Sequence, residues 1–274
     1  MIIKYILLIL FPLYLFLIAP RIFKKPDRSS LFGVHYAHRG LFNNKSEAPE
    51  NSLAAFRLAV ENGYGIELDV QLSKDNIPVV FHDASLKRMC GADGKVWDYT
   101  LAELKQMKLM RSNETIPTFQ ETLDAIAGKA PIIVEYKLDR VQTKVCELGN
   151  ELLTAYEKKY HGAYCIESFH PLALIWYKKN RPDVIRGQLS QNFQKGSETG
   201  KKNAAYTVLL THLITNVAAR PDFIAYNHLD YKNLSRRLCR IMGALSVTWT
   251  IKSVAEYEKV KSEFDLFIFD NCRL

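Results

Sequence analysis

The chain has 274 residues, of which 48% are hydrophobic and 24% charged, values ordinary for a globular protein of one large α/β domain or two small ones. The net charge is +8, but residues 1–30, with five basic side chains against one acidic one, contribute half of it. The remainder is only modestly basic, which argues against a dedicated nucleic-acid-binding surface. Five cysteines, an odd number without metal-ligand spacing, argue against a disulfide framework and fit a reducing compartment.

Residues 1–20 are an apolar stretch in which Lys4 is the only charged side chain. About 20 apolar residues span a bilayer core as a helix, so this stretch predicts an uncleaved transmembrane anchor, with a cleaved signal peptide as the alternative. Residues 21–30 are expected to be a short linker to a domain at residues 31–274. The basic side chains of the linker weakly place that domain on the cytoplasmic side of a membrane.

The first predicted strand, Val34–His38, delivers the sequence His-Arg-Gly at its end, at residues 38–40. A polar loop follows it. The helix that begins near Leu53 can be capped by Asn51 or Ser52, because short polar side chains accept hydrogen bonds from the free N–H groups of a first turn.

The stretch Gly65–Asp83 holds the most informative pattern. Glu67 and Asp69 alternate with apolar residues in a predicted strand, so both carboxylates share one face, roughly 7 Å apart at the backbone. Turn residues 74–76 and a second strand at 77–81 follow, and so short a connection requires an antiparallel hairpin, which folds His82 back toward the two carboxylates. Two buried carboxylates repel unless a cation lies between them. The pattern therefore predicts a cation site beside a histidine, and a strand with solvated carboxylates is the alternative.

With the hairpin arm set aside, eight strand-like segments that end in polar residues recur along the chain, most of them separated by helical ones. Eight is the number that a (β/α)8 barrel requires. The predicted strands are Val34–His38, Ile66–Val70, Ile132–Lys137, Tyr164–Ser168, Ile185–Leu189, Phe223–Tyr226, Leu245–Thr250 and Leu266–Asp270. The predicted helices lie at 100–108, 119–127, 142–159, 171–180, 203–217, 231–242 and 253–262, and a mobile loop is expected at Gln194–Asn203.

The predicted fold class is therefore α/β: a (β/α)8 TIM-type barrel with a β-hairpin after the second strand, preceded by the transmembrane helix. In such a barrel the carboxyl ends of all strands meet at one mouth, so the polar residues at these ends should converge. They are His38, Glu67, Asp69, Glu135 and Lys137.

Four short motifs follow one another along the first third of the chain: His-Arg-Gly at 38–40, Pro-Glu-Asn at 49–51, Glu-x-Asp at 67–69 and His-Asp at 82–83. In this order and spacing the chain resembles the glycerophosphodiester phosphodiesterase family. Later segments agree with it: Ile-Pro-Thr at 116–118, Glu-Tyr-Lys at 135–137, Ser-Phe at 168–169 and Trp-Thr-Ile at 249–251. The resemblance runs from about residue 34 to the end. It implies a TIM-type barrel that uses a divalent cation to hydrolyse glycerophosphodiesters to glycerol 3-phosphate and an alcohol.

By this resemblance Glu67, Asp69 and Glu135 are metal ligands. Three carboxylates make an all-oxygen set, which favours Ca²⁺ or Mg²⁺ over zinc. From the residues alone, Glu135 could equally be a carboxylate of the barrel core that pairs with Lys137. Glu50 is a possible fourth ligand, and its alternatives are a bond to Arg39 or a part in capping the next helix.

His38 and His82 are the predicted acid–base pair. Displacing an alkoxide from a phosphodiester needs one group to deprotonate the nucleophile and another to protonate the leaving oxygen, and two histidines in opposite protonation states can do both. Arg39 and Lys137 would supply positive charge to the phosphate. Trp249 is a candidate for substrate binding at the mouth, although an aromatic residue there is as readily part of the core.

The leading prediction is thus a metal-dependent phosphodiesterase that acts on a small molecule, without a nucleic-acid partner. A lysophospholipase D-type cleavage of membrane lysolipids is the first alternative, in which the N-terminal helix would hold the mouth near lipid. A non-catalytic barrel that binds lipid headgroups is the second. The presence of both histidines together with three carboxylates argues against the second alternative, because binding alone needs no acid–base pair.

Overall fold

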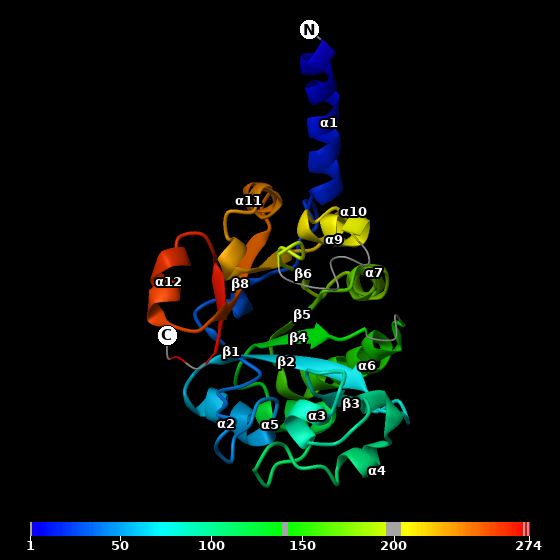
Figure 1. The fold of residues 1–274 in the computed structure, drawn as a ribbon, viewed down its shortest axis with the longest axis vertical. Helices are drawn as coiled ribbons and strands as arrows, with labels where there is room; N and C mark the ends of the chain where they lie inside the picture. Colours follow the sequence, from blue (N-terminus) through cyan, green and yellow to red (C-terminus); the bar gives the residue numbers. More distant parts are fainter. Residues whose placement is uncertain (1, 139–141, 196–203, 271, 273) are drawn as a thin grey trace.

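The computed structural model describes residues 2–138, 142–195, 204–270, 272 and 274. Of the mobile loop expected at Gln194–Asn203, residues 196–203 lie outside the described part of the chain. Eight parallel strands close into a barrel, because β1 pairs with β9 on one side and with β2 on the other (Figure 1). The strands are β1 (Tyr36–His38), β2 (Gly65–Leu72), β4 (Ile132–Tyr136), β5 (Tyr164–Ser168), β6 (Arg186–Ser190), β7 (Phe223–Asn227), β8 (Leu245–Ile251) and β9 (Leu266–Phe269). All eight predicted strands are present within two residues at each end.

The predicted hairpin is also confirmed. β3 (Pro78–Val80) runs antiparallel to β2, with Val80 opposite Val70. The chain that follows the hairpin, up to residue 116, packs on it around a small apolar cluster of its own. Its buried members are Val79, Phe81, Leu86, Met89, Val96, Leu104, Leu109 and Ile116. This cluster fixes the hairpin at the side of the barrel mouth.

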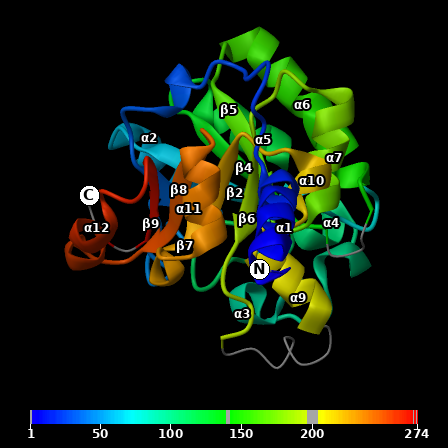
Figure 2. The same ribbon diagram turned by 90° about the horizontal axis from the view of Figure 1, so that it is seen from above.

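Helices alternate with the strands and surround the barrel (Figures 1 and 2), so the architecture is that of a TIM barrel. They are α2 (Leu53–Glu61), α3 (Lys87–Cys90), α4 (Leu101–Leu104), α5 (Phe119–Ile126), α6 (Lys144–Tyr160), α7 (Pro171–Asn180), α9 (Ala204–Thr211), α10 (Asn216–Ala219), α11 (Leu234–Ile241) and α12 (Val254–Val260). Ser52 caps α2 by accepting a hydrogen bond from the Ala55 N–H, as one of the two predicted caps. The single helix predicted at 203–217 is interrupted between α9 and α10 by a turn in which Leu213 adopts a φ of 59°.

Two apolar layers follow from the strand alternation. Side chains on the outer face of the sheet, such as Ile66, Leu68 and Val134, pack under the helices. Side chains on the inner face fill the barrel, among them Tyr36, Ile133, Cys165, Phe223 and Val247. Toward the carboxyl ends of the strands this inner layer gives way to charged residues. The charged layer therefore lies directly above a packed apolar layer.

The predicted transmembrane anchor is wrong. Helix α1 (Ile2–Ile18) has 17 residues and is about 26 Å long at 1.5 Å per residue, shorter than the roughly 30 Å of a bilayer core. Its last turn is held by the barrel, where Ile18 is fully buried and its carbonyl oxygen accepts a hydrogen bond from Asn216 Nδ2. Across the described residues no helix is both long and apolar enough to cross a membrane. The prediction of a single-pass membrane protein with a cytoplasmic barrel depended on this anchor and is wrong for the same reason. Membrane contact through this helix is not supported.

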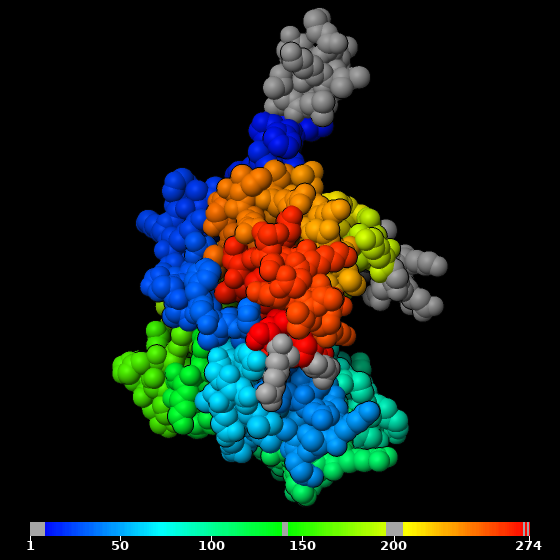
Figure 3. Space-filling view, turned by 90° about the vertical axis from the view of Figure 1, so that its left-hand side faces the viewer, coloured from blue at the N-terminus to red at the C-terminus, as the bar shows by residue number. Residues whose placement is uncertain are grey.

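Helix α1 projects from one side of the domain, with its base against α10 and α11 (Figure 1). The end of α1 next to the domain is the blue segment at the top of Figure 3. Tyr14 and Ser235 share a hydrogen bond of 2.6 Å at this base. The predicted linker then crosses the amino ends of the strands, held there by bonds such as that from Lys25 Nζ to the Gly243 carbonyl oxygen. Leu31 is buried against the inner layer, and its carbonyl oxygen accepts a hydrogen bond from Tyr36 Oη. Residues 21–31 thus lie at the end of the barrel opposite its mouth, whereas α1 packs on the helices at its side.

Candidate active site

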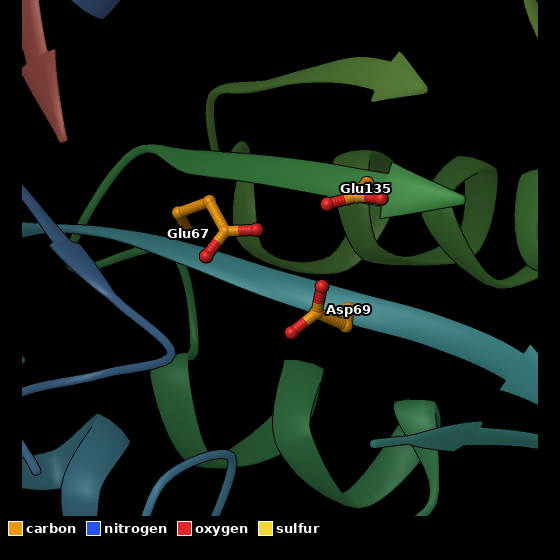
Figure 4. Close-up of side chains that lie close together, drawn as sticks. All are labelled: Glu67, Asp69 and Glu135. Carbon is orange, nitrogen blue, oxygen red and sulfur yellow. The ribbon is translucent and has the colours of Figure 1, made fainter. Parts of the chain in front are cut away.

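Three buried carboxylates meet at the mouth of the barrel. Glu67 and Asp69 extend from the same face of β2, and Glu135 extends from β4, where it is paired in register with Asp69 (Figure 4). One oxygen from each side chain lies within 4.8 Å of the others. The three residues are no more than 6% exposed. The same-face prediction for Glu67 and Asp69 is confirmed, and the alternative of solvated carboxylates is excluded.

The pKa values of these three carboxyl groups are shifted by burial and by their neighbours in a way that favours a bound cation. Burial raises the pKa of Glu67 well above its usual range, and the neighbouring carboxylates of Asp69 and Glu135 raise it further. Burial also opposes ionisation of Asp69, but Lys137, followed by His82 and Arg39, holds its pKa well below the usual range. A divalent ion between the three carboxylates would favour the charged form of them all. The donor set therefore fits a divalent cation.

Lys137 lies beside the same carboxylates. Its Nζ is 2.8 Å from Asp69 Oδ1 and 2.6 Å from Glu135 Oε1. The pairing of Glu135 with Lys137, which the sequence left as an alternative to metal binding, is thus present together with the trio. The positive charge of Lys137 partly neutralises the negative charges of Asp69 and Glu135.

Arg39 and Asn51 orient the trio from the loop between β1 and α2. The Arg39 backbone, with a φ of 58°, directs its N–H to Glu67 Oε2 at 3.2 Å. Asn51, with a φ of 56°, donates from Nδ2 to Asp69 Oδ2 at 2.8 Å and from its backbone N–H to the Arg39 carbonyl oxygen. A left-handed backbone is strained in residues other than glycine, and these hydrogen bonds stabilise that conformation at both positions.

Glu50 lies beside the trio but is engaged by two arginines. Its Oε1 accepts from Arg39 Nη1 at 2.6 Å and from Arg88 Nη2 at 2.7 Å, and its Oε2 accepts from Arg88 Nη1 at 2.8 Å and from Asn44 Nδ2 at 3.0 Å. These contacts favour the ion-pair alternative for Glu50 over a metal-ligand role. Burial alone would raise the pKa of Glu50, but Arg88, Arg39 and Asn44 lower it to about 2.

Replacing Glu50 with glutamine should therefore destabilise the fold in a pH-dependent way. A carboxyl group with a pKa near 2 in the folded chain and near 4.5 in the unfolded chain stabilises the fold above pH 4.5, and this contribution disappears as the pH falls toward 2. We expect Glu50→Gln to lower the free energy of unfolding by roughly 2–3 kcal/mol at pH 7 and by less than half of that near pH 3. Urea unfolding at both pH values measures it, and an equal loss at both would contradict the ion-pair assignment.

His38 stands at the end of β1. Its Nε2 is 3.9 Å from Glu67 Oε2, and its Nδ1 is 4.0 Å from Asp270 Oδ2. Burial lowers the pKa of His38 well below its usual range, and the positive charge of Arg39 lowers it further. His38 is therefore neutral near pH 7, the state in which an imidazole can accept a proton.

His82 enters the mouth from the hairpin, as predicted. The Phe81 N–H donates to the Asp69 carbonyl oxygen, which holds the end of the hairpin against β2. His82 Nδ1 is hydrogen-bonded to Asp83 Oδ1 at 2.7 Å, and a third of the side chain is exposed. Nε2 is thus the ring nitrogen that remains for a ligand.

These side chains surround a pocket of about 420 Å³. Its wall includes His38, Arg39, Glu50, Glu67, His82, Glu135 and Trp249 from the predicted set. Asp69 and Lys137 lie directly behind it through their contacts with Arg39 and Glu135. Trp249 donates from Nε1 to the Ala225 carbonyl oxygen and packs edge-on against Phe169 at 5.5 Å. The structure thus brings every predicted site residue to one mouth.

Two acidic residues of the pocket were not predicted. Glu167 on β5 is 1% exposed and is paired in register with Glu135, and burial raises its pKa well above the usual range. Asp270 follows β9, and burial raises its pKa as well. Both lie in predicted strands, and an acidic residue in an otherwise apolar strand is the signal that could have identified them.

Comparison with known proteins agrees with this geometry. Residues 38–260 match the sequence model of the Glycerophosphoryl diester phosphodiesterase family. A glycerophosphodiester phosphodiesterase from Caldanaerobacter subterraneus subsp. tengcongensis is 36% identical over 164 residues, which cover 57% of this chain and 65% of that protein. One from Bacillus subtilis is 27% identical over 255 residues, which cover 86% of this chain and 80% of that protein. The chain thus matches just under two thirds of the length of the Caldanaerobacter relative.

Among solved structures, a phosphodiesterase from Oleispira antarctica in complex with the product sn-glycerol-3-phosphate has a similar fold. The two structures have a TM-score of 0.68 at 25% sequence identity, over 88% of this chain and 94% of the other. The likeness therefore extends over most of the chain.

Proposed function

Because the chain belongs to the glycerophosphoryl diester phosphodiesterase family, we propose that it hydrolyses glycerophosphodiesters to glycerol 3-phosphate and an alcohol. The observation that carries this proposal is the gathering of three buried carboxylates, two histidines and an arginine around one pocket. A phosphodiester carries one negative charge, and such a pocket offers it positive groups together with proton donors and acceptors on both sides.

Glu67, Asp69 and Glu135 would hold one divalent cation, Ca²⁺ or Mg²⁺, because all three donors are carboxylate oxygens. When bound, the ion would supply positive charge to the phosphoryl oxygens in the transition state. Arg39, on the pocket wall, would hold the phosphate, and Lys137, behind the wall beside Asp69 and Glu135, would add positive charge to the site. Trp249 would form an apolar wall for the substrate, since the indole is half-buried and already fixed by Phe169.

His38 would act as the base and His82 as the acid. The neutral, half-buried imidazole of His38 would take the proton from the attacking nucleophile. His82, with Nδ1 engaged by Asp83, would give a proton from Nε2 to the leaving alkoxide. The two histidines come from different elements, β1 and the hairpin, so they can serve different oxygens of the same phosphate.

Product identification with and without a chelator tests the proposal. The full chain should release glycerol 3-phosphate from glycerophosphocholine and glycerophosphoethanolamine, and dialysis against EDTA should abolish release until Ca²⁺ or Mg²⁺ is restored. A lysolipid in the same panel tests the alternative substrate, which depended on the anchor that the structure does not support. Full activity after dialysis in excess EDTA would refute the metal assignment, and the absence of glycerol 3-phosphate from every diester would refute the function.

A further inference from the structure

Arg88 joins two carboxylates at the edge of the pocket. Toward Asp83 it donates from Nε at 2.6 Å and from Nη2 at 3.0 Å. Toward Glu50 it donates from Nη1 at 2.8 Å and from Nη2 at 2.7 Å. One planar guanidinium thus makes a two-pronged contact with each carboxylate, a geometry that fixes both acids relative to one another.

One arm of this arrangement leads to His82. Asp83, held by Arg88, is hydrogen-bonded to His82 Nδ1 at 2.7 Å. A carboxylate on Nδ1 sets which ring nitrogen carries the proton and how the ring is turned, so that Nε2 is the nitrogen presented to a substrate. Gln71 Nε2 donates to the carbonyl oxygens of Phe81 and Asp83, which holds the backbone on both sides of His82. The orientation of the ring then depends on the position of the Asp83 side chain.

The other arm leads to the metal-ligand trio. Glu50, held by Arg88, accepts from Arg39 Nη1 at 2.6 Å, and Arg39 Nε lies 3.5 Å from Asp69 Oδ2. A continuous series of charge-assisted contacts therefore runs from His82 through Arg88 to Asp69.

Arg88 itself is carried by a well-anchored segment. It belongs to the short helix α3, between Leu86 and Met89, which are buried in the cluster under the hairpin. Its own side chain is 45% exposed, so its net charge is largely screened by water. Geometry, rather than charge at a distance, is therefore what Arg88 contributes.

We propose that Arg88 is a positioning residue for proton donation: through Asp83 it holds His82 in line with the leaving oxygen, and through Glu50 it sets that line relative to the metal-ligand trio. The inference rests on the proposed function, because His82 has a leaving group to protonate only in a phosphodiester cleavage. It assigns a role to a residue that is not part of the pocket wall and whose polar partners are Asp83 and Glu50 rather than the metal-ligand trio.

A comparison of two substrates tests this role. The full chain and its Arg88→Ala and Arg88→Lys variants are assayed on glycerophosphocholine, whose alkoxide needs a proton, and on the nitrophenyl diester of glycerol 3-phosphate, whose leaving group does not. We expect kcat on glycerophosphocholine to fall about 10- to 100-fold in both variants, with much smaller changes on the nitrophenyl diester and in KM. Lysine should not restore the rate, since an ammonium group cannot make both two-pronged contacts. Guanidinium added at millimolar concentration should partly restore Arg88→Ala, and methylammonium should not.

The ratio of the two rates in one sample does not depend on how much of a variant is folded, so a loss of stability cannot imitate the expected result. Lys87→Ala is the matched control, because Lys87 lies in the same helix, is two-thirds exposed and pairs with the exposed Asp93. Equal losses on both substrates, or full rescue by lysine, would overturn the proposal while leaving the function intact. A wild-type chain without activity on either diester would instead refute the proposed function.

Discussion

Asp69→Asn should remove most of the cation affinity of the protein and lower kcat more than about 100-fold, beyond the usual effect of losing a residue that only supports a metal ligand. Asp69 is the fully buried member of the trio, and it is the one whose pKa is held low, so it supplies the most reliable negative charge there. Its carboxylate also accepts a hydrogen bond from Asn51 and forms an ion pair with Lys137. An amide has one accepting oxygen and cannot serve both donors together with a cation.

The measurement needs a readout besides activity. Titration of the wild-type chain with Ca²⁺ or Mg²⁺ should raise its Tm, because an ion that binds only the folded state stabilises it by about 2.7 kcal/mol at 100 times the dissociation constant. Asp69→Asn should lose this shift, and Asp93→Asn, with a side chain that is 91% exposed, should keep it. A variant that retains the wild-type shift and rate would show that the trio holds no catalytic ion.

Local alternation explains how much of the site could be predicted. Glu67 and Asp69 are separated by Leu68 within one strand, and the two-residue period of a strand places both on one face whatever the fold. The hairpin could be predicted equally well, because so few residues between Asp69 and His82 allow only an antiparallel return. Both features depend on neighbours in the sequence, and both are confirmed.

Contacts between distant segments explain what could not be predicted. The ion pair of Glu50 depends on Arg88, 38 residues further along the chain, and on how the segment after the hairpin docks on the barrel. Whether Glu167 faces the pocket or the helices depends on the stagger of eight strands, which is set only when the barrel closes. An acidic residue in a predicted strand therefore indicates a functional site, but it does not show whether the side chain faces the pocket or the surrounding helices.

The N-terminal error has a similar origin. Counting apolar residues suggested a span of about 20, but the length available to a bilayer also depends on where the helix ends and what it packs on. The helix ends at Ile18, and the residues that follow are tied to the amino ends of the barrel strands. The apolar composition predicted the helix correctly, but it could not show whether the helix packs on the barrel or in a bilayer.

His82→Ala should lower kcat on glycerophosphocholine at least about 100-fold, the lower limit for the loss of a general acid. Alanine leaves Asp83 with Arg88 as its partner, so the network beneath the histidine should persist while its proton donor is gone. On the nitrophenyl diester the loss should be much smaller, because that leaving group departs without a proton. His161→Asn is the control, since His161 is an exposed residue in left-handed backbone, which asparagine accepts.

Comparison with His38→Ala separates the two histidines. A base acts on the nucleophile, which is the same for every substrate, so His38→Ala should slow both diesters by similar factors. An acid acts on the leaving oxygen, so only His82→Ala should distinguish them. Equal losses on good and poor leaving groups in His82→Ala would refute the acid role, and a leaving-group dependence in His38→Ala alone would reverse the assignment. Because Asp83 and Arg88 act through His82, adding Arg88→Ala to His82→Ala should then lower kcat on glycerophosphocholine little further.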